Sequence, residues 1–143
     1  PYQLYQARVA GADAVLFIAS ILSNQDLIYL GKIATSLGLS ILVEVHNANE
    51  FERVLDLNTF KLIGINNRDL KSFKTDLLIT ESLAREFNYP VNNQNIVLVS
   101  ESGLSTKMDL EKVYGYGAKA VLIGESLMRK ENIEKGLREL IED

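Results

Sequence analysis

The sequence ILVEV at residues 41–45 is a short apolar run interrupted by a single carboxylate. Four similar runs flank it, at residues 14–18 (AVLFI), 62–65 (LIGI), 96–99 (IVLV) and 120–123 (AVLI). Runs of this length with little alternation are typical of strands that are buried on both faces, as in a parallel sheet. Their starts lie about 20 to 35 residues apart, which leaves room for a crossover helix between consecutive strands.

The intervals between these runs carry apolar residues at helical spacing, which predicts amphipathic helices. The stripe in residues 24–37 stops before Gly38, a residue type that favours a helix end. The predicted helices span residues 2–10, 24–37, 49–55, 76–87, 105–114 and 132–141, with one further helical turn at 127–128. This alternation predicts an α/β fold with a parallel sheet, either an open doubly wound sheet or a (β/α) barrel.

Length and composition narrow the classes of function. A chain of 143 residues favours one domain. Its net charge of −4, without a basic block, argues against nucleic acid as a partner. No apolar run approaches the roughly 20 residues that span a bilayer, so we expect no membrane partner. With no cysteine and one histidine, the chain cannot build a disulfide scaffold, a thiolate site or a histidine cluster, so we expect no metal site.

Polar residues gather where the predicted strands end. Glu44 lies near the end of the second run, and the next three runs lead into residues 66–69 (NNRD), 100–103 (SESG) and 124–126 (GES). The carboxyl ends of parallel strands form the active-site face in both kinds of α/β fold. We therefore expect these segments to meet at one site.

Two carboxylates are the candidates for acid–base chemistry. Alternation along its strand places Glu44 on the same face as Leu42, toward a barrel interior, where a carboxylate must be paired or protonated. This suits a general acid or base, although a carboxylate paired with a structural lysine or arginine would also fit. Glu101 follows its strand at the same rim, or is a solvated loop charge. Paired carboxylates divide acid and base roles, but glycosidases also use them, so the pair does not select a reaction.

Two glycine turns indicate a phosphate site. Gly103 and Gly124 follow the last two strands, where barrels often bind phosphate through backbone N–H groups at a helix start. Ordinary tight turns are the alternative reading. The N–H of Glu125 could contribute, whereas its carboxylate would repel phosphate. Arg68 is a candidate for a substrate anion or for pairing with Asp69, and His46 is expected to be a loop residue.

Four phrases occur in a fixed order along the chain: residues 43–46 (VEVH), 63–70 (IGINNRDL), 99–103 (VSESG) and 123–128 (IGESLM). The order and spacing of these phrases closely resemble the indole-3-glycerol-phosphate synthase family. The opening PYQLYQAR and the segment GADAVL at residues 11–16 match as well, so the resemblance covers essentially the whole chain. It implies a TIM barrel of tryptophan biosynthesis, a cytoplasmic carboxy-lyase that converts 1-(2-carboxyphenylamino)-1-deoxyribulose 5-phosphate to indole-3-glycerol phosphate without metal or organic cofactor.

The resemblance also implies a role for individual residues. Glu44 takes the place of the catalytic glutamate on the family's fifth strand, which transfers a proton. Asn66 corresponds to the asparagine on the sixth strand that helps bind and orient the substrate, and it is counted among the catalytic residues. Arg68 corresponds to the substrate-binding arginine on the same loop.

The last two strands carry the rest of the implied site. Glu101 and Ser102 correspond to the pair on the seventh strand that lies at the substrate, with Glu101 counted among the catalytic residues. Gly103, Gly124 and the N–H of Glu125 correspond to the phosphate-binding turns.

The chain is short for the whole barrel, which has eight strands and typically needs about 250 residues. Its five βα units, preceded by a helix, correspond to strands four to eight. We therefore expect residues 1–143 to form a single domain, the C-terminal portion of a partial (β/α)8 barrel. The family's two catalytic lysines lie on strands one and three, which would precede Pro1. Open strand edges predict that an N-terminal barrel segment or a second copy of the chain covers them.

Several functions stay open at this point. The chain is a synthase that acts when strands one to three are supplied, or a non-catalytic assembly unit that retains part of a phosphate site. A different phosphate-binding barrel, such as phosphoribosylanthranilate isomerase or the tryptophan synthase α subunit, is disfavoured by the string at residues 66–70. An open nucleotide-binding domain is disfavoured because no G-x-G-x-x-G follows the first strand.

Overall fold

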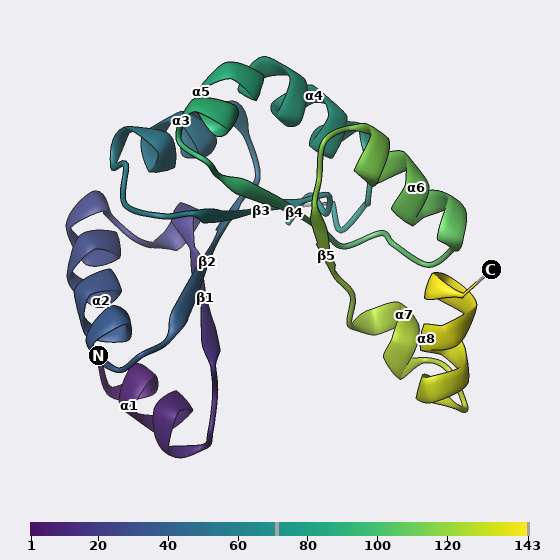
Figure 1. The fold of residues 1–143 in the computed structure, drawn as a ribbon, viewed down its shortest axis with the longest axis horizontal. Helices are drawn as coiled ribbons and strands as arrows, with labels where there is room; N and C mark the ends of the chain where they lie inside the picture. Colours follow the sequence, from purple (N-terminus) through teal and green to yellow (C-terminus); the bar gives the residue numbers. More distant parts are fainter. Residues whose placement is uncertain (71, 143) are drawn as a thin grey trace.

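Five parallel strands form one sheet whose spatial order is the order of the chain (Figure 1). The computed structural model describes residues 1–70 and 72–142. The strands are β1 (Ala14–Ile18), β2 (Ser40–Val45), β3 (Leu62–Asn66), β4 (Val97–Glu101) and β5 (Ala120–Leu122). Each strand pairs in parallel with the next one along the chain. Among the described residues, β1 and β5 each have one neighbour, so each leaves one edge unpaired.

Helices alternate with these strands, as the sequence predicts. They are α1 (Tyr2–Val9), α2 (Asn24–Ser36), α3 (Ala48–Asp56), α4 (Leu78–Glu86), α5 (Asn88–Asn93), α6 (Lys107–Gly115), α7 (Glu125–Met128) and α8 (Ile133–Ile141), with a short 3-10 turn η1 (Ala19–Ile21) after β1. None of the helices described is long and apolar enough to cross a membrane.

The sheet and its helices form an open arc. Figure 1 shows the strands on the inside of the curve and helices α2 to α6 around the outside, with α1 and the α7–α8 pair at the two ends. This arrangement confirms the prediction of a partial (β/α)8 barrel made of five βα units preceded by a helix.

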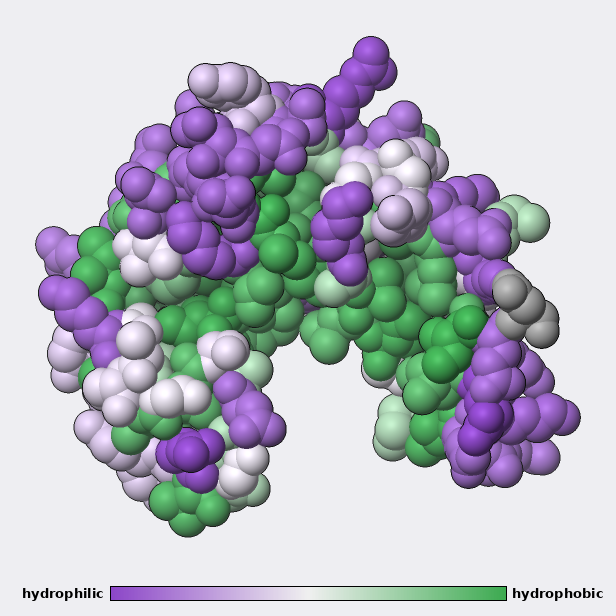
Figure 2. All heavy atoms as spheres, in the orientation of Figure 1, coloured by the Kyte–Doolittle hydropathy of each residue, from purple (hydrophilic) through white to green (hydrophobic). Residues whose placement is uncertain are grey.

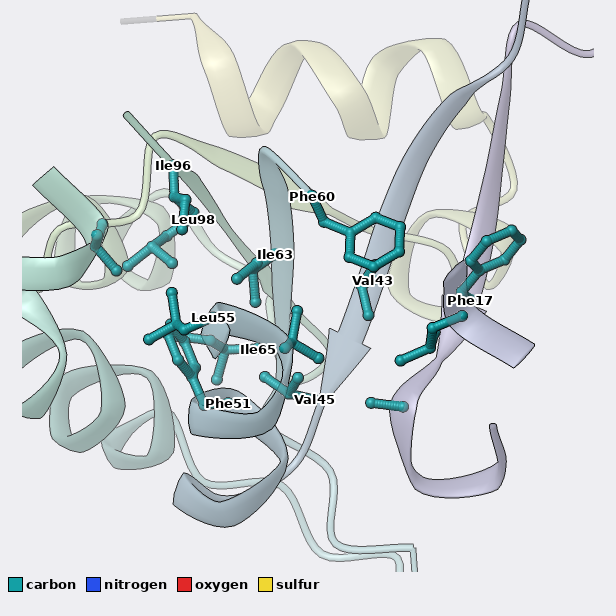
Figure 3. Packing of buried hydrophobic residues seen from close by; sticks show 14 of the residues in the cluster. Phe17, Val43, Val45, Phe51, Leu55, Phe60, Ile63, Ile65, Ile96 and Leu98 are labelled. Carbon is teal, nitrogen blue, oxygen red and sulfur yellow. The ribbon is translucent and has the colours of Figure 1, made fainter. Parts of the chain in front are cut away.

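The main hydrophobic core lies between the sheet and the outer helices (Figure 3). Val43 and Val45 of β2 and Ile65 of β3 are fully buried there, together with Phe51 of α3. The rings of Phe51 and Phe87 stack with their centroids 4.7 Å apart. Each such buried side chain contributes about 1.5 to 3 kcal/mol of hydrophobic stabilisation, so this layer fixes the strand register that positions the site.

The inner face of the arc is only partly covered. Leu16 of β1 is 38% exposed and Leu122 of β5 is 47% exposed, although both belong to strands of the sheet. Figure 2 shows a hollow between the two ends of the arc with hydrophobic side chains along its walls. The two edge strands therefore present apolar surface that a complete barrel would bury.

Several boundaries differ from those predicted, and the polar strand ends explain the most important ones. β3 continues to Asn66 and β4 to Glu101, and these two residues are register partners. Glu101 therefore lies inside the sheet rather than just past its strand. The backbone N–H of Asn67 donates to the carbonyl of Glu101 at 2.8 Å, which extends the pairing beyond the apolar run.

Helix ends also differ in detail. The helix predicted at residues 49–55 begins one residue earlier, and Asn47 caps it because its side-chain oxygen accepts from the Glu50 N–H at 3.0 Å. The predicted helix at 76–87 begins at Leu78 and is followed by α5, which the apolar pattern did not reveal. α5 contains Pro90, which is tolerated in the first turn because its missing N–H has no partner there in any helix.

Candidate active site

One open pocket of about 660 Å³ lies at the carboxyl ends of β2 to β5. All the residues that the sequence assigned to a site line it: Glu44, Asn66, Arg68, Glu101, Ser102, Gly103, Gly124 and Glu125. Parallel register brings them together, because the ends of neighbouring strands meet at one edge. The structure thus brings these residues into one pocket, and their assignment to a functional site stays a prediction.

Glu44 points to the inner face of the sheet, as the alternation along β2 predicts. Val43 and Val45 are fully buried on the helix side, whereas Glu44 lines the pocket and is 8% exposed. Nδ2 of Asn66 donates to Glu44 Oε1 at 3.1 Å, and His46 Nε2 lies 3.0 Å from the same oxygen. Contacts from two sides hold the carboxylate in one orientation.

Glu101 lies beside Glu44 and is only 3% exposed. Its burial, followed by the hydrogen bond and the charge of Glu44, raises the pKa of Glu101 to about 8. The Glu101 carboxyl therefore holds its proton near neutral pH. A protonated carboxyl beside a carboxylate is the arrangement that divides acid and base roles between two residues.

Gly64 makes room for the Glu101 carboxyl. A Cβ at residue 64, in the middle of β3, would overlap Oε1 of Glu101 and come within 3.3 Å of Leu42 Cδ1. Any larger residue would therefore displace Glu101. Gly64 was not among the predicted site residues, although a glycine inside a strand pattern indicates a close approach of another group.

Asn67, which is fully buried, holds the end of β4 through its side chain. Its Nδ2 lies within hydrogen-bond distance of Ser100 Oγ (2.9 Å) and of the carbonyl oxygens of Glu101 (3.0 Å) and Ser102 (3.1 Å). Its Oδ1 accepts from the hydroxyl of Thr80 at 2.8 Å. This network fixes the backbone on both sides of Ser102. The sequence placed Asn67 only within a polar segment and gave it no role.

The turn after β4 has an unusual backbone. Ser102 and Gly103 both have positive φ, +67° and +75°. A Cβ at Gly103 would lie 3.0 Å from Cβ of Thr75, so the turn requires glycine for conformation and for space. The hydroxyl of Ser126, in α7, donates to the carbonyl of Leu104 at 2.7 Å, which joins this turn to the one after β5.

The turn after β5 carries an ion-pair network. Gly124 is the N-terminal boundary of α7, and a Cβ there would meet nothing within 4 Å. The Glu125 carboxylate contacts the Arg68 guanidinium and lies 2.9 Å from Arg129 Nη2. Hydrogen bonding from Arg68, followed by its charge and the contacts of Arg129, lowers the pKa of Glu125. Arg68 therefore already pairs with a carboxylate at the rim of the pocket.

His46 was expected to be a loop residue, and it does follow β2 directly. Its side chain is nevertheless 13% exposed and lies between the carboxylates of Glu44 and Glu50. The helical spacing of residues 46 and 50 around an N-cap was the signal that could have placed it beside the site. The residues that the structure describes contain no group of three or more His, Cys, Asp or Glu side chains able to hold a metal ion.

Solved structures match nearly the whole chain in fold. A mandelate oxidase with benzoyl-formic acid superposes with a TM-score of 0.64 at 15% identity, covering 99% of this chain and 50% of its own. DHODH from Eimeria tenella, in complex with ferulenol, gives a TM-score of 0.67 at 12% identity, covering 96% and 51%. At these identities the likeness concerns the fold alone.

Sequence relatives identify the family. Indole-3-glycerol phosphate synthases from Prochlorococcus marinus strains MIT 9301 and MIT 9215 are each 55% identical to the chain over 139 residues. The alignment covers 97% of this chain and 47% of each relative, so the chain spans about half the length of these curated relatives. The family model for indole-3-glycerol phosphate synthase matches residues 1–140. The chain therefore belongs to the indole-3-glycerol phosphate synthase family.

Proposed function

We propose that this chain supplies the C-terminal half of the active site of an indole-3-glycerol phosphate synthase, a carboxy-lyase of tryptophan biosynthesis. The substrate is 1-(2-carboxyphenylamino)-1-deoxyribulose 5-phosphate, which undergoes ring closure, decarboxylation and dehydration. The observation that carries the proposal is that all the family's matching site residues in this chain line one pocket. The family's two lysines belong to earlier strands, so turnover needs that part of the barrel as well.

Glu44 and Glu101 are the proton-transfer groups in this proposal. Dehydration requires a proton on the departing hydroxyl and the removal of a proton from the adjacent carbon. A buried Glu101 with a pKa of about 8 retains a proton to give, and the neighbouring Glu44 carboxylate can accept one. Asn66 donates to Glu44 Oε1 from the neighbouring strand end and orients the substrate beside it.

The anionic groups of the substrate are assigned to the other side of the pocket. The turns at Gly103 and Gly124, with the N–H of Glu125, bind the phosphate through backbone donors. Arg68 and Ser102 contact the remainder of the substrate. Since Arg68 is paired with Glu125, an anionic group of the substrate that binds Arg68 competes with this carboxylate for the guanidinium.

The test is a turnover assay of the 143-residue chain, alone and after co-expression with the preceding barrel segment of a Prochlorococcus marinus relative. Formation of indole-3-glycerol phosphate is expected only from the combined protein, and Glu44→Gln should lower kcat by on the order of 100-fold or more. A combined protein that assembles but gives no product contradicts the proposal.

A non-catalytic assembly unit is the second candidate, and the uncovered inner face of the arc favours it for the isolated chain. In that case the chain binds the preceding barrel segment and contributes structure only. The same assay separates the two, because near-normal turnover by Glu44→Gln in the combined protein would remove Glu44 from the chemistry.

A further inference from the structure

His46 lies between two carboxylates at the edge of the pocket. Its Nε2 is 3.0 Å from Oε1 of Glu44, and its Nδ1 is 3.3 Å from Oε2 of Glu50. Both distances fall within hydrogen-bond range for an imidazole nitrogen and a carboxylate oxygen. The imidazole ring thus connects a residue of the pocket, Glu44, with a residue of helix α3, Glu50.

Glu50 is a fixed anchor for the ring. Its Oε2 accepts from the backbone N–H of His46 at 2.9 Å, and its Oε1 accepts from Nδ2 of Asn47 at 2.8 Å. Asn47 caps the same helix, since its Oδ1 accepts from the backbone N–H of Glu50 at 3.0 Å. The carboxylate is therefore held at the N-terminus of α3, where a negative charge is favoured, and it faces Nδ1 from a defined direction.

Whether Nε2 carries a proton decides whether the imidazole ring donates a hydrogen bond to Glu44 or accepts one from Asn66. Asn66 Nδ2 lies 3.1 Å from Glu44 Oε1 and 3.3 Å from His46 Nε2. Nε2 therefore either donates to Glu44 or accepts from Asn66, because one nitrogen cannot do both. Without a proton on Nε2, its lone pair would face the acceptor Oε1 of Glu44 at 3.0 Å, which is repulsive. The backbone N–H of Arg68 donates to Asn66 Oδ1 at 2.9 Å, which keeps the amide group turned toward Glu44.

We propose that His46 is the positioning residue for Glu44: its Nε2–H donates to Glu44 Oε1, and Glu50 holds the ring in place. Together with Asn66, it restrains one oxygen of the carboxylate and leaves the other for proton transfer. The charged groups that face this cluster are Glu50 from α3, Glu101 from β4 and Arg68 from the loop after β3, which lines the same pocket. This inference rests on the proposed function of Glu44.

The kinetic test compares substitutions in the complete synthase that carries this chain. His46→Leu should lower kcat by on the order of 10- to 100-fold with little change in KM, because Glu44 loses its orientation. His46→Gln should recover most of that loss, since the glutamine Nε2 can occupy the place of the imidazole Nε2. Glu50→Gln should fall between them, whereas Glu52→Gln, an exposed position on the same helix, should behave as the parent.

A spectroscopic test reports on the proton directly. His46 is the single histidine of these 143 residues, so 15N-histidine labelling with the His46→Gln spectrum as reference assigns its ring nitrogens. A proton on each ring nitrogen is expected, because Nε2 faces Glu44 Oε1 and Nδ1 faces Glu50 Oε2, and a carboxylate oxygen only accepts. A bare Nε2 with a protonated Nδ1 would overturn the proposal, because the ring would then accept from Asn66.

The role of Glu44 and the role of His46 are tested separately by these variants. If Glu44→Gln abolishes turnover and His46→Leu does not, only the role of His46 is wrong. If Glu44→Gln itself leaves turnover intact, the proposed function of Glu44 is wrong and the role of His46 falls with it. Circular dichroism on each variant shows whether a low kcat reflects lost folding, and the His46→Gln and Glu50→Gln variants keep the test decisive if His46→Leu does not fold.

Discussion

The carboxyl group of Glu101 is buried at the end of β4, with 3% of the residue exposed. It lies against Gly64, beside the Glu44 carboxylate, and its Oε1 is buried without a hydrogen-bond partner among the described residues. Burial of this kind disfavours the charged form, which is why its pKa is raised. The pH dependence of folding stability should therefore depend on Glu101, and a side chain at position 64 should disturb it.

Glu101→Gln should change how stability depends on pH. The pKa of Glu101 rises from its ordinary 4.5 to about 8 on folding, so the folded chain holds a proton that the unfolded chain releases. Its stabilisation is complete below about pH 4.5 and is lost as the pH rises toward 8. A glutamine has no such loss. The Tm of Glu101→Gln relative to the parent should therefore rise by several degrees between pH 5 and pH 8.5, as followed by thermal melts. Glu52→Gln serves as the control, and a constant Tm difference for Glu101→Gln would mean that Glu101 is ionised in the folded chain.

Gly64→Ala should disturb the site through Glu101. The added Cβ overlaps the buried carboxyl, so the side chain or the strand must shift, at a cost of about 1 to 3 kcal/mol in the free energy of unfolding. Turnover of the complete synthase should fall as well, because Glu101 leaves its place beside Glu44. Gly115→Ala is the matched control, since a Cβ there meets nothing within 4 Å. Equal unfolding free energies for the two variants would show that Glu101 relocates without cost.

The sequence predicted the residues that line the pocket better than the residues that support them. Glu44 was placed correctly because alternation along a strand assigns each side chain to a face. His46, Gly64 and Asn67 were missed as parts of the site because their contacts join different strands and helices. Such contacts depend on strand register, and a single amino-acid sequence does not state directly which residues lie opposite one another across strands.

At the scale of the elements, the two turns after β4 and β5 differ in what their glycines do. Gly103 has a positive φ and is crowded by Thr75, so its glycine is required by the fold. Gly124 has open space at the Cβ position, so packing within the described residues does not require glycine there. The hydrogen bond from Ser126 to Leu104 keeps the two turns together.

Substitution by alanine should affect stability at position 103 and substrate binding at position 124. Gly103→Ala should lower the free energy of unfolding by about 1 kcal/mol or more, because alanine is strained at positive φ. Gly124→Ala should leave stability unchanged within about 0.5 kcal/mol and chiefly raise KM in the complete synthase, because phosphate binding is weakened. Denaturant unfolding and steady-state kinetics measure both effects. An unchanged KM for Gly124→Ala would place the phosphate elsewhere.

Elements were predicted well where hydrophobic pattern alone decides them. The limits of β1, Ala14–Ile18, were predicted to the residue, because Asp13 precedes the apolar run and Ser20 interrupts it soon after its end. The strand predicted at residues 96–99 ends too early, because the last two residues of β4, Ser100 and Glu101, are polar. Their burial depends on Asn67 and Thr80, which lie far away in sequence. Tertiary partners thus decided the boundary that local composition could not.

At the scale of the molecule, the arc leaves two open strand edges and an apolar inner face. Unpaired parallel edges are templates for further pairing. The chain alone, with a mass of 16.0 kDa, should therefore self-associate in a concentration-dependent way by light scattering. Addition of the preceding barrel segment should replace these species by a one-to-one complex. A monomer whose near-UV circular dichroism shows ordered aromatic side chains would show that the inner face of the arc needs no cover.

The order of the strands in the sheet has a consequence for how the chain is made. Because the spatial order is the chain order, each strand finds its partner in the segment synthesised just before it; Ser40 pairs with Ala14, and Val97 with Leu62. None of the four strand pairings described here joins distant parts of the chain, so the loops that close on forming them stay short and inexpensive in entropy. The sheet can therefore grow in one direction while the ribosome is still translating, and at every stage the most recently added strand offers the edge on which the next one docks.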